Sequence, residues 1–320
     1  MRGNPVYKRE MTVSSRSIRV PVIMMVFNSV LALVALLNMY SMTSQVRVTA
    51  EISYASFLDL YVFVAAIEFL MLVFIMPALT SGSISGERER QTLNLMLSTQ
   101  MTPFQIVIGK LMSSMVNMAL LVVSSFPVFS LVFVYGGIRI ADLALLLLLY
   151  LAVALLSAGL GLCFSAVCRR STVATAISYG FLVFLIAGTY AVNYFIWSMA
   201  QMGAASYVNQ MGGIASQVNS GVLIYLMLFN PAVTFYQIIG AQAGNREVSA
   251  QVIQWFGSRS SNPILDAWIP VSLILQTLLA LLLLAVAVRA VDPVGRHQAR
   301  SRKREGRERK GRLCADLPEQ

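Results

Sequence analysis

Six long apolar stretches, separated by polar or charged segments, dominate the pattern of the sequence. Each has roughly the 20 residues that a helix needs to cross the hydrocarbon core of a bilayer. A spanning segment must satisfy its own backbone hydrogen bonds, which favours helices. The pattern therefore predicts an all-α integral membrane protein with six transmembrane helices, the first being a retained anchor rather than a cleaved signal. The stretches are Val20–Tyr40, Leu58–Leu79, Ile106–Tyr135, Leu143–Val167, Val173–Met199 and Ala267–Val288.

The positions of the basic residues predict which side of the membrane each connection faces. Cytoplasmic connections of membrane proteins carry an excess of Lys and Arg. If the chain starts in the cytoplasm and crosses six times, all but four of its 24 Lys and Arg residues fall on the cytoplasmic side. We therefore expect a multi-pass protein of the plasma membrane with both termini in the cytoplasm. The four exceptions are Arg47, Arg139, Arg246 and Arg259.

A seventh apolar stretch, residues 222–243, is interrupted in its middle by Asn230-Pro231. Proline removes a backbone donor, and an Asn-Pro pair favours a turn. Each half is too short to cross the membrane alone, and a seventh crossing would put the basic tail on the wrong side. We expect this stretch to lie in the outer interface or to dip into the membrane and return. It belongs to an extracytoplasmic segment, residues 200–266, of short helices.

The overall composition agrees with a membrane protein and changes how the net charge is interpreted. Hydrophobic residues make up 57% of the chain and charged residues 12%, whereas soluble domains carry about 25% charged residues. The formal net charge of +10 is concentrated at the ends of apolar stretches and in the tail, residues 293–320. We expect that tail to be disordered or bound to anionic membrane lipid, and we expect no nucleic-acid partner. We expect residues 1–292 to form a single transmembrane domain.

The inventory of residue types excludes several kinds of chemistry. The chain has one histidine, His297 in the tail, and three cysteines whose spacing fits neither a disulfide framework nor a metal site. Gly109-Lys110 lacks the upstream glycine and the following Ser or Thr of a nucleotide-binding loop. We expect no metal, no cofactor and no catalytic centre here, and any ATP must be hydrolysed by a separate chain.

The connection between the second and third spans, residues 81–109, carries the most informative polar pattern. Glu87 and Glu89 fall in an expected first helical turn, where the helix dipole favours negative charge. Leu93, Met96 and Leu97 continue at helical spacing as an apolar stripe. The pattern predicts a short amphipathic helix that lies along the membrane or projects from it.

A second helix start follows within the same connection. Thr102, Pro103 and Gln105 have the spacing of a capping box with proline at the first helical position. They predict that the third spanning helix begins here. The connection is therefore expected to run as helix, tight turn and helix at the cytoplasmic face.

Three groups of residues resemble the ABC type-2 transporter permeases. They are Asn4-Pro5-Val6 with Lys8-Arg9-Glu10, then Pro77-Ala78 leading to Ile84-Ser-Gly-Glu-Arg-Glu-Arg-Gln-Thr-Leu93, and Thr102-Pro-Phe-Gln-Ile-Val-Ile-Gly-Lys110. An Asn-Pro pair also precedes the last span. The resemblance is clear through the third span and continues by topology. It implies an exporter in which two six-helix halves, identical or different, pair with two ATPase subunits.

The same resemblance implies a role for the connection between spans two and three. In that family it is the coupling helix, which docks into a groove of the ATPase. By resemblance, Glu87, Arg88, Glu89, Arg90 and Thr92 lie at or near that contact. Charge reversal at Glu87 or Glu89 is then expected to uncouple the ATPase without unfolding the permease. On physical grounds alone a membrane-surface helix with no partner stays equally open, and the resemblance implies nothing about the cargo.

Glu68 is the notable ionisable residue inside a predicted span. A charge at the centre of the bilayer costs about 2.5–3.5 kcal/mol on insertion scales, so such a residue is a functional hypothesis by default. Glu68 could line the translocation path or bind a cation, or it could be a protonated side chain bonded to a neighbouring helix. It is also the residue on which two rival functions depend: an ion-coupled secondary transporter, or an intramembrane enzyme.

Small residues recur at four-residue spacing in the fourth span, at Ser157, Gly161 and Ser165. Such a face lets two helices approach closely. The sequence leaves open whether the contact is within one subunit or across a dimer.

Overall fold

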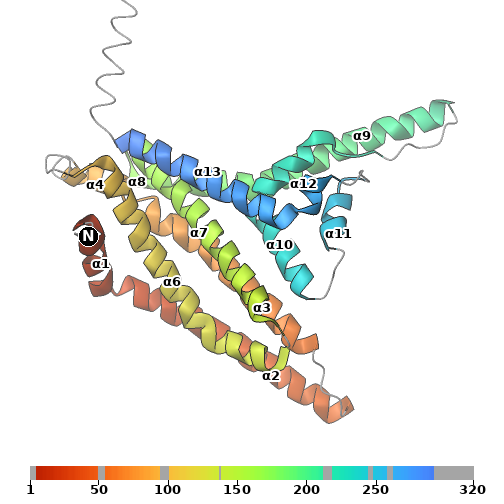
Figure 1. The fold of residues 1–320 in the computed structure, drawn as a ribbon, viewed down its shortest axis with the longest axis horizontal. Helices are drawn as coiled ribbons and strands as arrows, with labels where there is room; N and C mark the ends of the chain where they lie inside the picture. Colours follow the sequence, from red (N-terminus) through yellow and green to blue (C-terminus); the bar gives the residue numbers. More distant parts are fainter. Residues whose placement is uncertain are drawn as a thin grey trace, which may run out of the picture.

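Every regular element of the part of the chain that the structure describes is a helix (Figure 1). This computed structural model describes residues 5–49, 55–93, 101–136, 138–211, 218–243, 248–257 and 262–291. Residues 1–4, residues 292–320 and parts of six connections fall outside these ranges. The elements are α1 (Pro5–Arg16), α2 (Arg19–Thr49), α3 (Ala55–Thr80), α4 (Ser85–Glu89), α6 (Pro103–Gly136), α7 (Ile140–Val167), α8 (Ser171–Val183), η1 (Phe184–Gly188), α9 (Thr189–Met211), η2 (Gly221–Phe229), α10 (Pro231–Gln242), α11 (Val248–Gln254), α12 (Pro263–Asp266) and α13 (Trp268–Val291).

Six helices or continuous helix runs are long and apolar enough to cross a membrane. They overlap the six apolar stretches of the sequence, which confirms the prediction of an all-α protein with six candidate spans. The fifth span is one run through α8, the π-type turn η1 and α9. The six ranges are Pro21–Ser41, Leu58–Glu89, Pro103–Ser130, Ile140–Val167, Ser171–Ala205 and Trp268–Val291.

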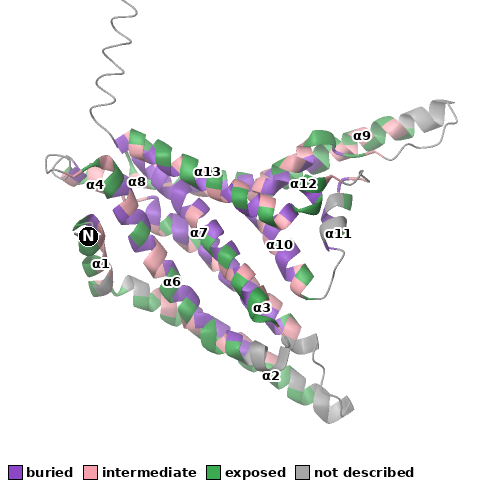
Figure 2. Ribbon diagram, in the orientation of Figure 1, coloured by how far each residue is buried: buried purple, intermediate pink, exposed green. Residues whose placement is uncertain are grey.

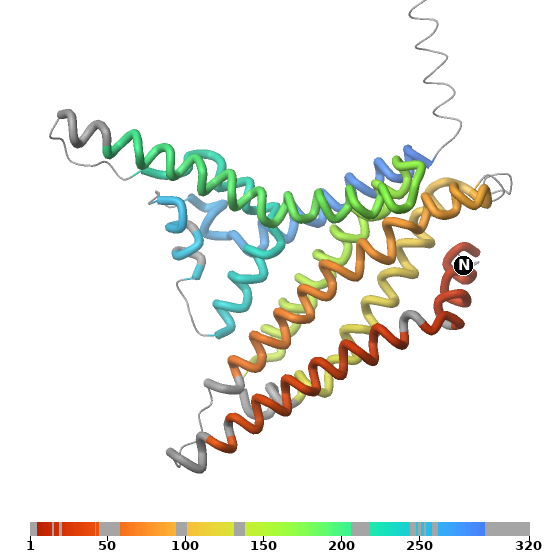
Figure 3. Tube along the Cα trace, turned by 180° about the vertical axis from the view of Figure 1, so that it is seen from behind, coloured from red at the N-terminus to blue at the C-terminus, as the bar shows by residue number. Residues whose placement is uncertain are grey.

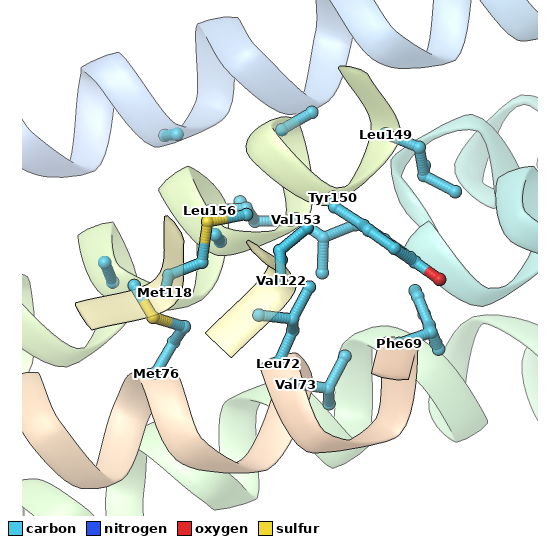
Figure 4. Packing of buried hydrophobic residues seen from close by; sticks show 14 of the residues in the cluster. Phe69, Leu72, Val73, Met76, Met118, Val122, Leu149, Tyr150, Val153 and Leu156 are labelled. Atoms are coloured by element: carbon cyan, nitrogen blue, oxygen red, sulfur yellow. The ribbon is translucent and has the colours of Figure 1, made fainter. Parts of the chain in front are cut away.

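The centre of the bundle is α7, against which α3, α6, α8 and α13 all pack. Its buried residues lie around the whole circumference of the helix, as expected for a helix that is apolar on every side. Figure 2 shows buried residues concentrated along α7 and on the faces that its neighbours turn toward it. The side chains labelled in Figure 4 come from three of these helices: Phe69, Leu72, Val73 and Met76 of α3, Met118 and Val122 of α6, and Leu149, Tyr150, Val153 and Leu156 of α7.

The small residues of α7 bring other helices of the same subunit close to it. A methyl group added at Gly161 would overlap the hydroxyl of Thr80 and lie 3.1 Å from the backbone nitrogen of Ser81. One added at Gly159 would lie 3.2 Å from the carbonyl oxygen of Ala280 in α13. The small-residue face is therefore a packing surface within the subunit, which settles the alternative that the sequence left open.

The helices converge at one end of the bundle and diverge at the other, as Figures 1 and 3 show from opposite sides. We call the converging end the α4 end, because α1, α4, the turn between α7 and α8, and the last residues of α13 all lie there. From it, α2, α3, α6 and α7 run in one direction, while α8–α9 and α13 diverge from them. The short elements η2, α10, α11 and α12 lie toward the open side of this fork.

The seventh apolar stretch forms a sharply bent helix pair. The 3₁₀ helix η2 and the α-helix α10 meet at Asn230 with a bend of 83°. Proline at the first position of α10 and the extended backbone of Asn230 explain why the helix restarts there. The predicted break is confirmed, and the geometry is that of a broken span or a re-entrant loop.

Candidate functional site

The connection of residues 81–109, which we call the coupling segment after its expected role, is held at its start by a serine from a different span. The backbone nitrogens of Ile84 and Ser85, at the start of α4, each donate to the hydroxyl oxygen of Ser165 at 2.9 Å. A serine oxygen has two lone pairs, so one hydroxyl can accept both bonds. Because Ser165 lies in the last turns of α7 and is fully buried, the start of α4 is fixed to the α4 end of the central helix.

Arg88 binds the end of that same helix. Its guanidinium donates to the carbonyl oxygens of Ala166, at 2.9 Å, and Cys168, at 3.1 Å. The last carbonyls of a helix have no partner within the helix and carry its partial negative charge. Arg88 therefore closes the carboxyl end of α7 within the permease.

Glu89 binds the start of the next helix, α8. Its carboxylate accepts from the backbone nitrogen of Ser171 at 2.8 Å and from the Ser171 hydroxyl at 3.0 Å. The first backbone N–H groups of a helix lack helical partners and favour a negative charge. Two adjacent residues of the coupling segment, one positive and one negative, thus bind the two sides of the α7–α8 turn.

Glu87 belongs to a partly buried charge cluster that joins α1, α4 and α6. The ammonium of Lys110, 4% exposed, lies 2.9 Å from Glu87 Oε1 and 3.1 Å from Glu10 Oε1. Arg9 adds a longer contact of 3.9 Å to Glu87. Two positive and two negative side chains meet, so the cluster is neutral, as a partly buried group of charges must be to avoid a large desolvation cost.

The helix of the coupling segment is interrupted by a turn immediately after α4, at Arg90 and Gln91. Gln91 has a positive φ of 58°, an uncommon conformation for a residue other than glycine. The Thr92 hydroxyl donates to the carbonyl oxygen of Glu87 at 3.1 Å across this turn. The first helical piece is therefore five residues long instead of continuing through Leu93, and the predicted stripe beyond Leu93 lies outside the described residues.

The exposed residues of this region form one charged surface. Glu89, Arg90 and Gln91 are exposed on the coupling segment, and Arg169 and Arg170 are exposed on the α7–α8 turn to which it is bonded. We call these five residues the α4 surface. Of the residues predicted to face an ATPase, Glu89 and Arg90 are in it, whereas Glu87, Arg88 and Thr92 are only partly exposed and bind within the chain.

The predicted start of the third span has the expected local geometry. The backbone nitrogen of Thr102 donates to the side chain of Gln105 at 3.2 Å, and the backbone nitrogen of Gln105 donates to the Thr102 hydroxyl at 3.3 Å. This is the reciprocal pair of a capping box, and α6 begins at Pro103. Since Lys110 lies on the same helix, α6 carries the charge cluster at a fixed distance from its capped start.

Glu68 is fully buried at the contact of α3 with α6 and α7. Its Oε1 atom lies 2.8 Å from the Ser125 hydroxyl, and Oε2 has no hydrogen-bond partner. Glu68 is absent from the lining of an apolar pocket between α2, α3 and α6, so this pocket gives no support for a place on a translocation path. The pocket is lined by Ile23, Met24, Leu72, Ile75, Met76, Leu79, Asn117, Met118 and Leu121.

The bent pair is joined to the fifth span by the side chain of Asn230. Its amide nitrogen donates to the carbonyl oxygen of Ile186 at 2.8 Å and to the Thr189 hydroxyl at 2.9 Å, and its oxygen accepts from the backbone nitrogen of Ala232 at 2.9 Å. Ile186 lies in the π-type turn, where carbonyls leave the regular helical ladder. One side chain therefore both caps α10 and satisfies the irregular turn opposite it.

Several residues of the site were not singled out by the sequence analysis. Lys110 was noted only as part of a Gly-Lys pair, although a lone cation inside an apolar helix was a signal that it needs acidic partners. Ser165 was noted only as a small residue, and Arg169 and Arg170 only as cytoplasmic charges. Among the described residues, no cluster of three or more His, Cys, Asp or Glu side chains could hold a metal ion.

Comparison with known proteins identifies the family of the chain. None of the curated proteins compared with it matches. A family model described as ABC-2 family transporter protein matches residues 5–290, a range that includes five candidate spans whole, the sixth except for its last residue, and the bent pair. The chain belongs to the ABC-2 transporter family and is a multi-pass membrane permease of that family.

Proposed function

We propose that this chain is the membrane-spanning subunit of an ATP-driven exporter, and that its α4 surface docks on a separate ATPase subunit. The observation that carries the proposal is the anchoring of the coupling segment. Residues 84–89 are bonded to α1, α6, α7 and α8, while Glu89, Arg90 and Gln91 stay exposed. A short segment tied to several spans can transmit a rigid-body displacement from a soluble partner to the bundle.

The charges of the α4 surface suit the rim of such a contact. Three of its five residues are arginines, so the partner groove should offer carboxylates. Rim charges set partner choice and association rate more than affinity. Because Arg169 and Arg170 lie on the turn that Arg88 and Glu89 hold, the contact extends over two connections rather than one.

The basic residues at the α4 end indicate how the chain is oriented in the membrane. We infer that the α4 end faces the cytoplasm, with both termini on that side, because the basic residues of the connections gather there and cytoplasmic connections are enriched in Lys and Arg. The polar segment of residues 200–266 would then be extracytoplasmic. Residues 1–292 act as one permease domain, and the tail of residues 293–320 contacts anionic lipid.

The proposal also includes a second permease subunit. Large apolar side chains are exposed along one side of α2, among them Met25, Leu33 and Leu36, and only 17% of its spanning window is buried. Lipid covers such a face in part. Pairing with a second copy, or with a related chain, would complete a path of which one six-helix subunit forms half.

The test is purification of the tagged chain from its native membrane in mild detergent, with vanadate-sensitive ATP hydrolysis as the assay. We expect a P-loop ATPase to co-purify with the wild type. The triple variant R90E, R169E and R170E should lose the co-purifying ATPase. The control variant R139E, which reverses the charge of an exposed residue at the opposite end of the bundle, should keep it. A wild-type chain that transports with no ATPase, driven by an ion gradient, would contradict the proposal and favour a secondary transporter.

A further inference from the structure

The surroundings of Glu68 determine which atom holds its proton. Glu68 lies on α3 and is fully buried, and its carboxyl group lies 2.8 Å from the Ser125 hydroxyl and close to the Tyr150 hydroxyl. Its second oxygen is buried without a partner. An ionised carboxylate has about four acceptor sites and is costly to bury unless they are filled or a cation lies beside it.

The Ser125 hydroxyl has one hydrogen for two contacts, one with Glu68 Oε1 and one with the Val122 carbonyl oxygen, so one contact needs a hydrogen from elsewhere. The Ser125 oxygen lies 2.7 Å from the backbone carbonyl oxygen of Val122. A carbonyl oxygen can only accept, so this contact requires the serine to donate its hydrogen there. The contact with Glu68 then has no hydrogen left on the serine side, and the hydrogen must come from the carboxyl group.

The aromatic neighbour of Glu68 offers no proton either. The Tyr150 hydroxyl of α7 donates to the carbonyl oxygen of Ala65 at 2.9 Å. Tyr61, two helical turns from Glu68 on α3, donates to the side-chain oxygen of Gln242 at 2.6 Å. Neither tyrosine hydroxyl therefore has a hydrogen left for Glu68, and Glu68 is in none of the ion pairs of the described residues.

We propose that Glu68 is a resident proton site: a neutral carboxylic acid that donates its hydrogen to Ser125 and so links α3 to α6. The bond chain then runs in one direction, from the Glu68 carboxyl to the Ser125 oxygen and from the Ser125 hydroxyl to the Val122 carbonyl. Every hydrogen has one acceptor, and no charge is buried. The proton stays with the protein through the transport cycle, so Glu68 does not couple transport to an ion gradient.

The direction of the bond makes the site distinguishable from a buried carboxylate. Glutamine is neutral, has nearly the same shape and keeps a donor toward Ser125, so E68Q should fold and keep the activity of the wild-type complex within about twofold. An ion-coupling or cation-binding carboxylate cannot be replaced in this way, because glutamine neither releases a proton nor carries a charge.

The experiment is infrared difference spectroscopy of the full-length chain in lipid nanodiscs at neutral pH, wild type minus E68Q. We expect the carbonyl stretch of a protonated carboxylic acid, which shifts to lower frequency in D2O. The matched control is wild type minus E87Q, which should show carboxylate bands, because Glu87 pairs with Lys110 at 2.9 Å. In S125A the acid band should persist but move to higher frequency, since the carboxyl loses its acceptor.

Other outcomes would overturn the proposal. Carboxylate bands in the E68Q difference would show an ionised group, and carboxylate bands that change when Na⁺ replaces K⁺ would show a cation site. An acid band that S125A leaves unmoved would remove Ser125 as the acceptor. An E68Q chain that fails to fold would also contradict it, because glutamine supplies the neutral donor that the proposal requires. These spectra need no ATPase, so they fail or succeed independently of the proposed export function.

Discussion

The ammonium nitrogen of Lys110 lies 2.9 Å from Oε1 of Glu87, and this contact joins the third span to the coupling segment. Lys110 also binds Glu10 at 3.1 Å, so the N-terminal helix α1 meets the same nitrogen. A displacement of α4 is therefore opposed by α1 and α6 together. This explains how a helix of five residues, too short to be stable alone, can hold a defined position.

Removal of the lysine should destabilise the permease more than removal of either acid. In K110M, Glu10 and Glu87 lose their shared partner and repel each other, and loss of one partner of a buried pair costs about 3–5 kcal/mol. The measurement is the midpoint of thermal unfolding in detergent. The double variant K110M/E87Q should recover much of the loss, whereas additive losses would show that the pair is not coupled.

Arg88 should stabilise the turn between α7 and α8. In R88M, the carbonyls of Ala166 and Cys168 lose a charged donor, and hydrogen bonds to charged groups contribute about 1.5–3 kcal/mol. We expect faster amide exchange over the first turn of α8, measured by mass spectrometry. R90M, which changes a neighbouring exposed arginine, is the control, and equal exchange in both variants would remove the role assigned to Arg88.

The close approach of α3 to α7 depends on Gly161. G161A places a methyl group against Thr80 and the backbone of Ser81, and overpacking of this kind costs about 1–3 kcal/mol. G180A is the matched control in α8, because a methyl group there meets nothing within 4 Å and alanine favours a helix by up to about 1 kcal/mol. If both variants unfold at the same temperature, the approach at Gly161 is looser than the structure shows.

The bent pair depends on Asn230. N230A removes the cap of α10 and leaves the Ile186 carbonyl without its donor, at a cost of about 1–2 kcal/mol. Limited proteolysis should then cleave near residues 230–243 faster than in the wild type. N219A, an exposed asparagine near the start of η2, should leave that rate unchanged; a rate raised equally by both variants would show only a general loosening of the segment.

The sequence predicts features that depend on neighbouring residues or on length. The capping box of Thr102 and Gln105 is a contact over three positions, so its spacing alone identifies it. The break at Asn230-Pro231 is equally local, because proline limits the backbone wherever it lies. The six spans follow from length and apolar content, which the bilayer fixes.

The contacts of the coupling segment could not be predicted in the same way. Arg88 and Ala166 are 78 positions apart, and their bond exists because α7 ends beside α4, which depends on the packing of Gly161 against Thr80. We expected the charged side chains between positions 87 and 92 to lie together at or near the contact with an ATPase. The structure divides them, because unpaired helix ends of α7 and α8 lie within reach of Arg88 and Glu89 and need charged partners.

The central claim is that the α4 surface contacts an ATPase, and site-specific photo-crosslinking tests it most directly. A benzophenone amino acid replaces Arg90, on the α4 surface, or Ile140, an exposed residue at the opposite end. After irradiation of native membranes, mass spectrometry identifies the captured protein. We predict a P-loop ATPase captured from position 90 and not from position 140. Transport-competent membranes in which position 90 captures only lipid or other proteins would contradict the account.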